Sequence, residues 1–356
     1  MLGFLLPLFV YTFVLVLHVV IPARHVDGYV VDPSTGRPLR YRLNGLRVFA
    51  VTVGLYVIGA HRGLIAWDLF WTCRWQMAAG ACLVGLVFTL AIVLPGPARG
   101  ALASDLYLGR LDNPQWAGGR VDAKMFLYLV GAVMLELNVL SFAAHHVLAH
   151  RADPSPGVLL YAVLFTFFLA EYLTFEEVHL YTYDFFAERV GFKLGWGCLV
   201  FYPFFYCVGL WATAARPNPH TPHALLALAL VLFFGGWLLS RGANLQKYLF
   251  KTAPERRLLG LIAPVAVAAD GKQLLCSGFW RLSRHINYLG EIAMAAGLTL
   301  ALGWPATLLP WLYPLYYVAL LVPRQHFDDR RCAAKYGALW TEYCRRVPYR
   351  IIPWIY

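Results

Sequence analysis

A short stretch of the chain places acids and phenols inside otherwise apolar sequence. Its ionisable and phenolic members are Glu176, Glu177, His179, Tyr181, Tyr183 and Asp184. An ionisable residue inside an apolar span costs about 2.5–3.5 kcal/mol or more, so such residues are usually retained for function. Carboxylic acids and phenols can hold or relay protons. Taken together, the group favours proton chemistry, whereas each residue taken singly could line a wet groove or pair with an arginine of a neighbouring helix.

Three further polar residues fall inside apolar stretches. Glu136 and Asn138 lie within residues 125–148, and Glu291 follows Asn287 by four positions, which is one helical turn. The same two interpretations apply to them: a functional group at membrane depth, or a partner for a cation on a neighbouring helix.

The last third of the chain interleaves cations with flat aromatic rings. The cations are Lys247, Lys251, Arg281, Arg284, Arg324, Arg330, Arg331, Lys335, Arg345, Arg346 and Arg350, and the rings are Trp280, Tyr288, Tyr336, Trp340, Tyr343 and Tyr349. Cations suit phosphate groups and flat rings can stack on a purine or a nicotinamide. Asp328 and Asp329 could accept hydrogen bonds from a ribose hydroxyl or a carboxamide. The pattern fits a phosphorylated dinucleotide better than polymeric nucleic acid; the alternative is a cytosolic surface that follows the positive-inside rule.

Other common sites are not indicated. The seven cysteines show no CxxC spacing, and His145, His146 and His150 lack the carboxylate of an HExxH metal motif, so we expect no metal. The chain has no GxGxxG, GxxxxGK[ST] or GxSxG motif. A nucleotide would therefore be bound by neither a Rossmann fold nor a P-loop.

These residues must be positioned by elements that cross a membrane. The chain has 356 residues, of which 60% are hydrophobic and only 14% charged, too few charges to cover soluble domains. We predict an all-α, polytopic transmembrane bundle with about eight to ten spans. Candidate spans are residues 2–22, 45–60, 76–95, 125–148, 158–180, 194–214, 223–240 and 288–322, the last broken by Gly303-Trp304-Pro305, with a weaker apolar piece at 258–269.

The net charge of +11 is unevenly placed, because residues 241–356 hold fifteen Lys and Arg against six Asp and Glu. We predict one membrane-embedded domain over 1–356. Within it, residues 1–240 form mainly the spans and the substrate side, and residues 241–356 form a cofactor-binding part that faces the cytosol.

Several motifs resemble the sterol reductases, a family that includes sterol Δ14-reductases, 7-dehydrocholesterol reductase and the lamin B receptor. The most specific are residues 274–280 (LLCSGFW) with 284–291 (RHINYLGE), and residues 328–337 (DDRRCAAKYG). Earlier pieces agree in order. They are Asn44-Gly45-Leu46-Arg47, Gly109-Arg110 with Asn113-Pro114, residues 122–126 (DAKMF), and Asn244 with Gln246-Lys247.

The resemblance implies an oxidoreductase that reduces a sterol carbon–carbon double bond with NADPH, in a C-terminal cofactor pocket. Carried over, Lys247 and Lys251 would meet the adenosine-side phosphates. The remaining implied cofactor residues are Leu275, Trp280, Arg284, Asn287, Tyr288, Arg324, Asp328, Cys332, Lys335, Tyr336 and Tyr343.

Alkene reduction also needs an acid that protonates one carbon before hydride reaches the other. Our candidates for the proton donor are Asp328, Tyr181, Tyr183 and Glu177. Residues 44–47 favour a Δ14 substrate and residues 140–144 favour Δ7; the balance favours Δ14, with Δ7 and Δ24 as alternatives. Lys251 stands where the family usually has Arg, and residues 181–192 depart from the family pattern, which leaves the sterol open.

Two rival classes fit parts of the pattern. An isoprenylcysteine-type membrane methyltransferase would bind S-adenosylmethionine instead of NADPH, and a non-catalytic scaffold would bind sterol alone. The expected partners are sterol and membrane lipid, without nucleic acid or metal, and no oligomeric state is indicated. The expected location is a bacterial inner membrane or the endoplasmic reticulum.

Overall fold

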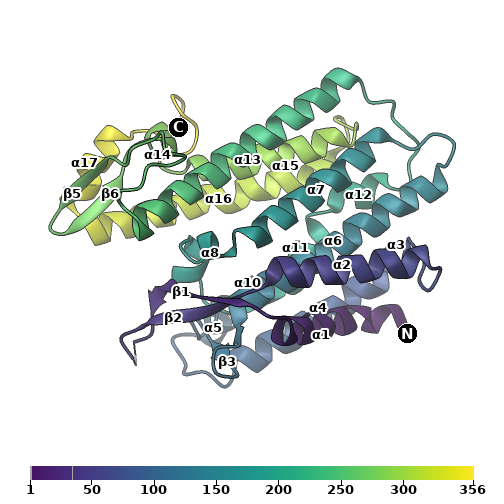
Figure 1. Ribbon diagram of the computed structural model, residues 1–356, viewed down its shortest axis with the longest axis horizontal. Coiled ribbons are helices and arrows are strands. Elements are labelled where there is room, and N and C mark those ends of the chain that lie inside the picture. Colours follow the sequence, from purple (N-terminus) through teal and green to yellow (C-terminus); the bar gives the residue numbers. More distant parts are fainter. Residues whose placement is uncertain (1, 34) are drawn as a thin grey trace. The chain divides into compact units, whose positions relative to one another are not determined.

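The computed structural model describes residues 2–33 and 35–356, which form mostly helices (Figure 1). The described chain divides into two compact units, the first ending at His220 and the second spanning Thr221–Tyr356.

The first unit is built around α6 (Ala123–Ala149), most of whose residues are buried. Asp122 begins this helix because its side chain accepts hydrogen bonds from the backbone N–H groups of Lys124 and Met125, both at 3.0 Å. The other long helices are α1 (Leu2–Val20), α2 (Gly45–His61), α4 (Arg74–Val93) and α7 (Pro156–Thr174). An interrupted helix follows, made of α10 (Phe192–Trp196), η1 (Gly197–Phe201), α11 (Tyr202–Phe205) and α12 (Val208–Thr213).

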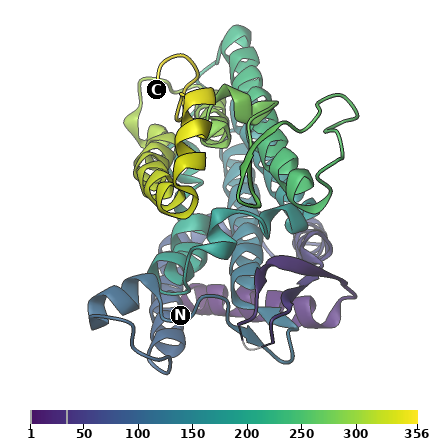
Figure 2. The same cartoon turned by 90° about the vertical axis from the view of Figure 1, so that its left-hand side faces the viewer.

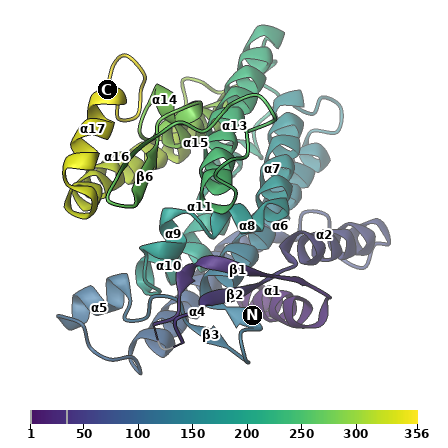
Figure 3. The same ribbon diagram turned by 60° about the vertical axis from the view of Figure 1, so that its left-hand side comes forward.

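Short elements join these helices. The helical ones are α3 (Leu69–Thr72), α5 (Leu102–Leu108), α8 (Glu176–His179) and α9 (Tyr183–Phe186). Two antiparallel hairpins pair β1 (Arg24–Val31) with β2 (Pro38–Leu43), and β3 (Gln115–Trp116) with β4 (Val121–Asp122). The first hairpin lies alongside α8 and α9 (Figure 3), where Tyr41 and Leu43 share a buried apolar cluster with Met125, Leu180 and Phe185.

The second unit packs α13 (His223–Thr252), α15 (Ile286–Ala301) and α16 (Leu308–Tyr336) beside one another. A hairpin of β5 (Ala266–Ala269) and β6 (Lys272–Leu275) and the short helix α14 (Phe279–Leu282) connect the first two helices. The last helix, α17 (Ala338–Arg346), yellow in Figure 2, follows α16 and packs on β5. One apolar cluster joins the hairpin to α17 through Val267, Cys276, Trp340, Tyr343 and Val347.

The expected polytopic helical bundle is confirmed, but the number of long spans is smaller. Among the described residues, six helices are long and apolar enough to cross a membrane. The apolar helices Gly45–His61 and Ile286–Ala301 are shorter, at 17 and 16 residues, which gives about 24–26 Å against ~30 Å of hydrocarbon. The chain is a multi-pass membrane protein.

One predicted apolar piece is not a span. Leu258 and Ile262 pair as an isolated β-bridge, and residues 266–269 form β5 instead of a helix. The prediction of a membrane span there was wrong because residues 266–269 pair with β6. Of this segment only Val267 joins the hairpin cluster, whereas Leu259, Leu261 and Val265 are exposed. The break at 303–305 is confirmed, since it separates α15 from α16.

Helices α13 and α15 approach closely where both carry glycine. A Cβ atom on Gly236 would lie 2.5 Å from the carbonyl oxygen of Gly290 and 2.7 Å from the backbone nitrogen of Met294, whereas a Cβ on Gly235 would meet nothing within 4 Å. Small residues at such a contact let two backbones pack tightly within a membrane.

We therefore expect Gly236→Ala to lower the stability of the protein by about 1–3 kcal/mol, because the added methyl group must push two backbones apart. The matched variant Gly235→Ala should leave the thermal unfolding temperature in detergent unchanged or slightly raised. Equal unfolding temperatures for the two variants would contradict this account of the interface.

Candidate functional site

The segment of acids and phenols forms a turn that is tied to the start of α2. Glu176 is buried, at 7% exposure, and its Oε2 accepts a hydrogen bond of 3.0 Å from the backbone N–H of Gly45. A Cβ atom at position 45 would lie 2.3 Å from Oε1 of the same carboxyl group. The glycine of the Asn-Gly-Leu motif is therefore required so that the carboxyl group can reach this helix terminus.

The neighbouring Asn44 ties the same point to the end of α1. Its Nδ2 donates to the carbonyl oxygens of His18 and Ile21 at 2.9 and 3.0 Å, and its Oδ1 lies 2.7 Å from Nδ1 of His18. Arg42 donates to three carbonyls at this end as well, those of His18, Val19 and Ile21. These bonds satisfy backbone oxygens that have no partner within the helix.

Lys124 holds the other end of the turn. Its side chain is fully buried, and its Nζ donates to the carbonyl oxygens of Asp184 and Phe185, both at 2.9 Å. The DAKMF motif thus supplies Asp122, which caps α6, and Lys124, which reaches from α6 to α9. The sequence showed the motif but not this contact. The signal that could have indicated it was a charged residue in the first turn of an otherwise apolar helix.

The tyrosines proposed as proton donors lie between these two attachments. Tyr181 packs against Tyr29 of the hairpin with ring centroids 5.7 Å apart, and Tyr29 also contacts Phe186 at 5.8 Å. Tyr183 is the first residue of α9 and packs edge-on against Phe186 at 5.9 Å. Both tyrosines therefore stand among aromatic rings.

Glu177, the third candidate of this unit, faces outward. Its Oε2 lies 2.5 Å from a guanidinium nitrogen of Arg24, in a pair that is partly exposed on both sides. For single acids of residues 176–184, the sequence left open that each pairs with an arginine, and Glu177 does so.

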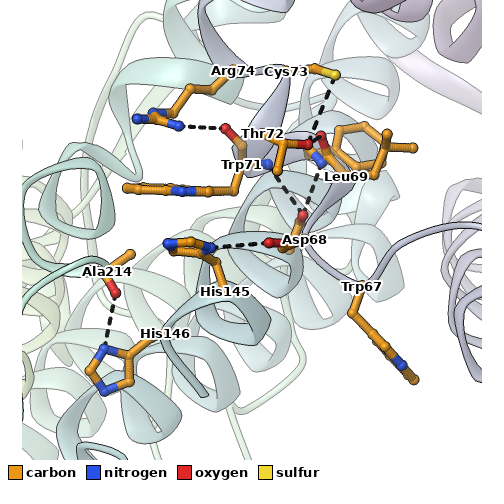
Figure 4. A network of polar contacts seen from close by, with 12 residues as sticks. Trp67, Asp68, Leu69, Trp71, Thr72, Cys73, Arg74, His145, His146 and Ala214 are labelled. Carbon is orange, nitrogen blue, oxygen red and sulfur yellow. Dashed lines mark hydrogen bonds and ion pairs between the residues drawn. The ribbon is translucent and has the colours of Figure 1, made fainter. Parts of the chain in front are cut away.

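A separate polar network lies where α3 and α4 meet α6 (Figure 4). The indole ring of Trp71 stacks on His145 at 4.5 Å, and Cζ of Arg74 lies 3.8 Å from its centroid on the opposite face. Nδ1 of His145 is 3.1 Å from Oδ2 of Asp68. His146 contacts a backbone carbonyl, that of Ala214, at 3.1 Å. Within residues 2–33 and 35–356, no three His, Cys, Asp or Glu side chains gather as metal ligands.

In the second unit, hydrogen bonds from both helices fix α14 against α13. Gln246 donates to the carbonyl oxygen of Ser277 and accepts from the backbone N–H of Phe279, both at 3.0 Å. Nε1 of Trp280 donates to the carbonyl oxygen of Ala243 at 2.9 Å. The ammonium of Lys247 then lies 5.7 Å from the centroid of the Trp280 ring, within the range of a cation–π contact.

Two predicted cofactor residues, Asn287 and Tyr288, lie in the first turn of α15. Nδ2 of Asn287 donates to Oδ1 of Asn244 at 3.3 Å, while Oδ1 of Asn287 is buried with no hydrogen-bond partner among the described residues. Tyr288 is buried and stacks on His285 at 4.8 Å. The amide oxygen of Asn287 remains available for a further donor.

Of the adjacent Asp328 and Asp329, it is Asp329 that lies close to cations of the same unit. Gln325 donates to its Oδ2 at 2.6 Å, and Arg350, His285 and Arg284 lie 3.5, 3.8 and 3.9 Å from its carboxyl oxygens. Burial acts to raise the pKa of Asp329, but the nearby His285, Arg284 and Arg350 hold it below its usual range. Asp328 instead interacts electrostatically with Lys247.

Arg284, two residues before α15, contacts the C-terminal segment. It is buried, its Nη1 donates to Sγ of Cys344 at 2.6 Å, and its backbone N–H donates to the carbonyl oxygen of Tyr349 at 2.9 Å. Its Nε is buried without a hydrogen-bond partner in the described part of the chain. The sequence grouped Arg284 with the phosphate ligands, whereas most of its nitrogens are engaged within the unit.

The remaining predicted cofactor residues gather around α16 and its neighbours. Tyr343, Tyr336 and Cys332 pack in the apolar cluster with the β5–β6 hairpin, where burial raises the pKa of Tyr343, and burial together with Asp328 raises that of Cys332 to about 12. Lys335 is exposed with its ammonium 5.1 Å from the Tyr336 ring centroid. Leu275 ends β6 in a buried position, Lys251 is exposed near the end of α13, and Arg324 lies on α16.

Glu291 has the partner that the sequence left open. Nη1 of Arg241 on α13 lies 2.6 Å from its Oε1, and Ser240 donates to the same oxygen at 2.6 Å. Glu136 accepts a 2.6 Å hydrogen bond from Thr166 and Asn138 donates to the carbonyl oxygen of Pro203 at 2.9 Å. For Glu291, the interpretation as a partner for a cation on a neighbouring helix is therefore confirmed.

The fold and the two groups of polar residues define a multi-pass membrane protein with an acid- and phenol-bearing turn in one unit and a cation-rich unit after it. The chain belongs to the ergosterol biosynthesis ERG4/ERG24 family, whose model matches residues 2–356. The resemblance to sterol reductases is confirmed. Because the family model matches nearly the whole chain, the match argues against the isoprenylcysteine-type methyltransferase.

Three relatives show how far the likeness extends. The chain is 32% identical to the Delta(14)-sterol reductase of Arabidopsis thaliana over 375 residues, covering 100% of this chain and 98% of that protein. It is 34% identical to the Delta(14)-sterol reductase TM7SF2 of Mus musculus, over 99% and 85% of the two chains. It is 31% identical to the Delta(14)-sterol reductase erg24 of Schizosaccharomyces pombe, over 92% and 79%.

The buried Glu176 should give the protein a pH-dependent stability. Burial raises its pKa from 4.5 to about 7, although the Gly45 N–H and Arg24 act in the opposite direction. Because the folded state then keeps a proton that the unfolded chain releases, stability should fall as pH rises from about 4.5 to about 7, by up to ~3 kcal/mol. Thermal unfolding in detergent across this range measures the slope.

The variant Glu176→Gln keeps an oxygen that can accept from Gly45 and should flatten that slope. The matched variant Glu177→Gln changes a half-buried neighbour and should leave the slope as in the unchanged protein. An unaltered slope in Glu176→Gln would refute the assignment.

Proposed function

We propose that this protein reduces the Δ14 double bond of a sterol with NADPH, as a step of sterol biosynthesis. The observation that carries the proposal is the arrangement in the second unit. The Lys247 ammonium lies 5.7 Å from the Trp280 ring centroid and interacts electrostatically with Asp328, and Asn287 bonds Asn244, three residues before Lys247 on α13. In a family whose similar members are named Delta(14)-sterol reductase, this arrangement supports a site for an anionic hydride donor.

The residues present fit NADPH in their chemistry. Its phosphates are anions that suit Lys247 and Lys251, and its two ring systems suit the flat faces of Trp280 and Tyr336. The buried, unpartnered Oδ1 of Asn287 is an acceptor of the kind that a carboxamide N–H requires. The cofactor residues inferred from the family are proposed to act here, with Arg284 holding the C-terminal segment in place through its own contacts.

When bound, NADPH supplies a hydride to the sterol. The chain must supply the proton, and the four candidates are Asp328, Glu177, Tyr181 and Tyr183. The tyrosines are the better donors, because a neutral phenol carries no charge to desolvate among the rings of Tyr29 and Phe186. Glu177 is engaged with Arg24 at the surface, and Asp328 acts electrostatically on Lys247.

The distribution of charge supports a cytosolic second unit. Between residues 221 and 356, every Lys and Arg lies in the half of α13 and α16 that leads to the hairpin and α17, or in the segments that follow. The turn between α15 and α16, at the other ends of these helices, has none. An excess of cations marks the cytoplasmic side of a membrane protein, which is also where NADPH is available.

The function is tested by incubating the purified protein with NADPH and a panel of Δ14, Δ7 and Δ24 sterols and identifying the products by mass spectrometry. We expect the Δ14 sterol alone to gain two hydrogens, and the same mixture without NADPH to stay unchanged. Reduction of a Δ7 or Δ24 bond with the Δ14 bond untouched would contradict the assignment.

Lys247 should be needed for cofactor binding. We expect Lys247→Met to raise the Kd for NADPH at least tenfold, which corresponds to about 1.4 kcal/mol, and to raise the Kd for NADH less, because NADH lacks one phosphate. Binding is measured by equilibrium titration in detergent. Arg256→Gln removes an exposed cation of the same unit and should keep the NADPH Kd within about twofold. An unchanged NADPH Kd in Lys247→Met would exclude the proposed site.

A further inference from the structure

Lys124 is a charged group with no access to solvent. Its side chain is fully buried, and the two hydrogen bonds of its ammonium that the structure gives go to the carbonyl oxygens of Asp184 and Phe185. The ammonium also lies 5.9 Å from the centroid of the Phe185 ring. A buried cation is costly unless its partners are held in place, so its position and that of α9 depend on each other.

The two carbonyl groups belong to the end of a very short helix. Helix α9 has four residues, so its last carbonyl oxygens have no partners in the next turn. A cation at the C-terminal end of a helix satisfies these oxygens and interacts favourably with their partial negative charge. Lys124 therefore does for α9 what a longer helix would do through its own backbone.

The charges around Lys124 keep the ammonium in this place. Asp122, Asp184, Asp112 and Glu188 all act on it electrostatically. Asp122 is itself fixed by the N–H groups at the start of α6 and by a 3.1 Å hydrogen bond from Gln115. The cation is thus held from α6 and directed at the backbone of the turn.

The residues on that turn are the ones proposed to donate the proton. Tyr183 is the first residue of α9, and Tyr181 precedes it by two positions. Phe185 anchors the same turn in the apolar cluster with Tyr41 and Tyr128, at ring distances of 6.1 and 5.9 Å. A shift of the backbone at residues 184 and 185 should therefore also move the side chains of Tyr181 and Tyr183.

We propose that Lys124 is a positioning residue, which fixes the backbone of α9 so that Tyr181 and Tyr183 present their hydroxyl groups to the sterol. The inference rests on the proposed function for the identity of the donors. It does not place Lys124 in contact with substrate or cofactor.

The test compares Lys124→Met, Lys124→Arg and Lys193→Met. The first removes both hydrogen bonds, the second keeps the charge but forces a longer, planar group into a fully buried place, and the third removes a lysine that pairs with Glu188 at 2.6 Å. The readouts are kcat and KM for a Δ14 sterol, the Kd for NADPH, and amide hydrogen exchange of the peptide 180–190.

We expect Lys124→Met to lower kcat at least tenfold and Lys124→Arg to lower it severalfold, with the NADPH Kd within about twofold and faster hydrogen exchange confined to residues 180–190. Lys193→Met should match the unchanged protein. A kcat within about twofold of normal in either Lys124 variant would overturn the proposal. If Lys124→Met does not fold, Lys124→Arg decides the matter by the same criteria.

Failure of the proposed function is seen separately. It would appear as absence of Δ14 reduction by the unchanged protein, before any substitution is made. Hydrogen exchange of residues 180–190 still tests in that case whether Lys124 fixes the backbone of α9, because this measurement needs neither sterol nor NADPH. Unchanged exchange in both Lys124 variants would show that Lys124 does not hold the turn.

Discussion

Cations placed at the C-terminal ends of helices hold the first unit together. Arg42 donates to the last carbonyls of α1, and Lys124 donates to those of α9. Arg110 donates to the carbonyls of Val93 and Leu94 at the end of α4 and to that of Gly96 just beyond it. The last carbonyl oxygens of a helix have no partner within it, so other donors of the chain must satisfy them where they are buried. The same bonds fix where the connecting segments lie, and these segments carry the polar motifs of the family.

The motifs of the first unit converge on one turn. Asn44 and Gly45 bring the ends of α1 and α2 to Glu176, and Lys124 reaches the carbonyls of residues 184 and 185. The second unit is organised differently, around Asp329 as the shared partner of Arg284, Arg350 and His285. The turn in one unit and the cation-rich site in the other correspond to the two requirements of alkene reduction, a proton and a hydride, in the function proposed here.

Sequence patterns located these groups but not their contacts. The apolar stretches predicted most helices, because a membrane imposes a length that can be read directly. The weaker apolar piece at 258–269 contains no helix, and its residues 266–269 form a strand, since short apolar runs do not distinguish the two structures. Spacing also could not separate Asp328 from Asp329, as only the fold decides which of two adjacent side chains faces Arg284. The sequence contains no sign that Gly236 and Gly290 allow α13 and α15 to approach closely, because this contact depends on which helix packs opposite.

The central claim is that one hydrogen of the product comes from a bound hydride donor and the other from an acidic group of the protein. It is tested most directly by reducing a Δ14 sterol with NADPH deuterated at the transferable position and locating the label by NMR. The account predicts deuterium on the more substituted carbon of the former double bond, and solvent-derived hydrogen on its neighbour. A product without deuterium from the carrier, or with the label on the less substituted carbon, would contradict it.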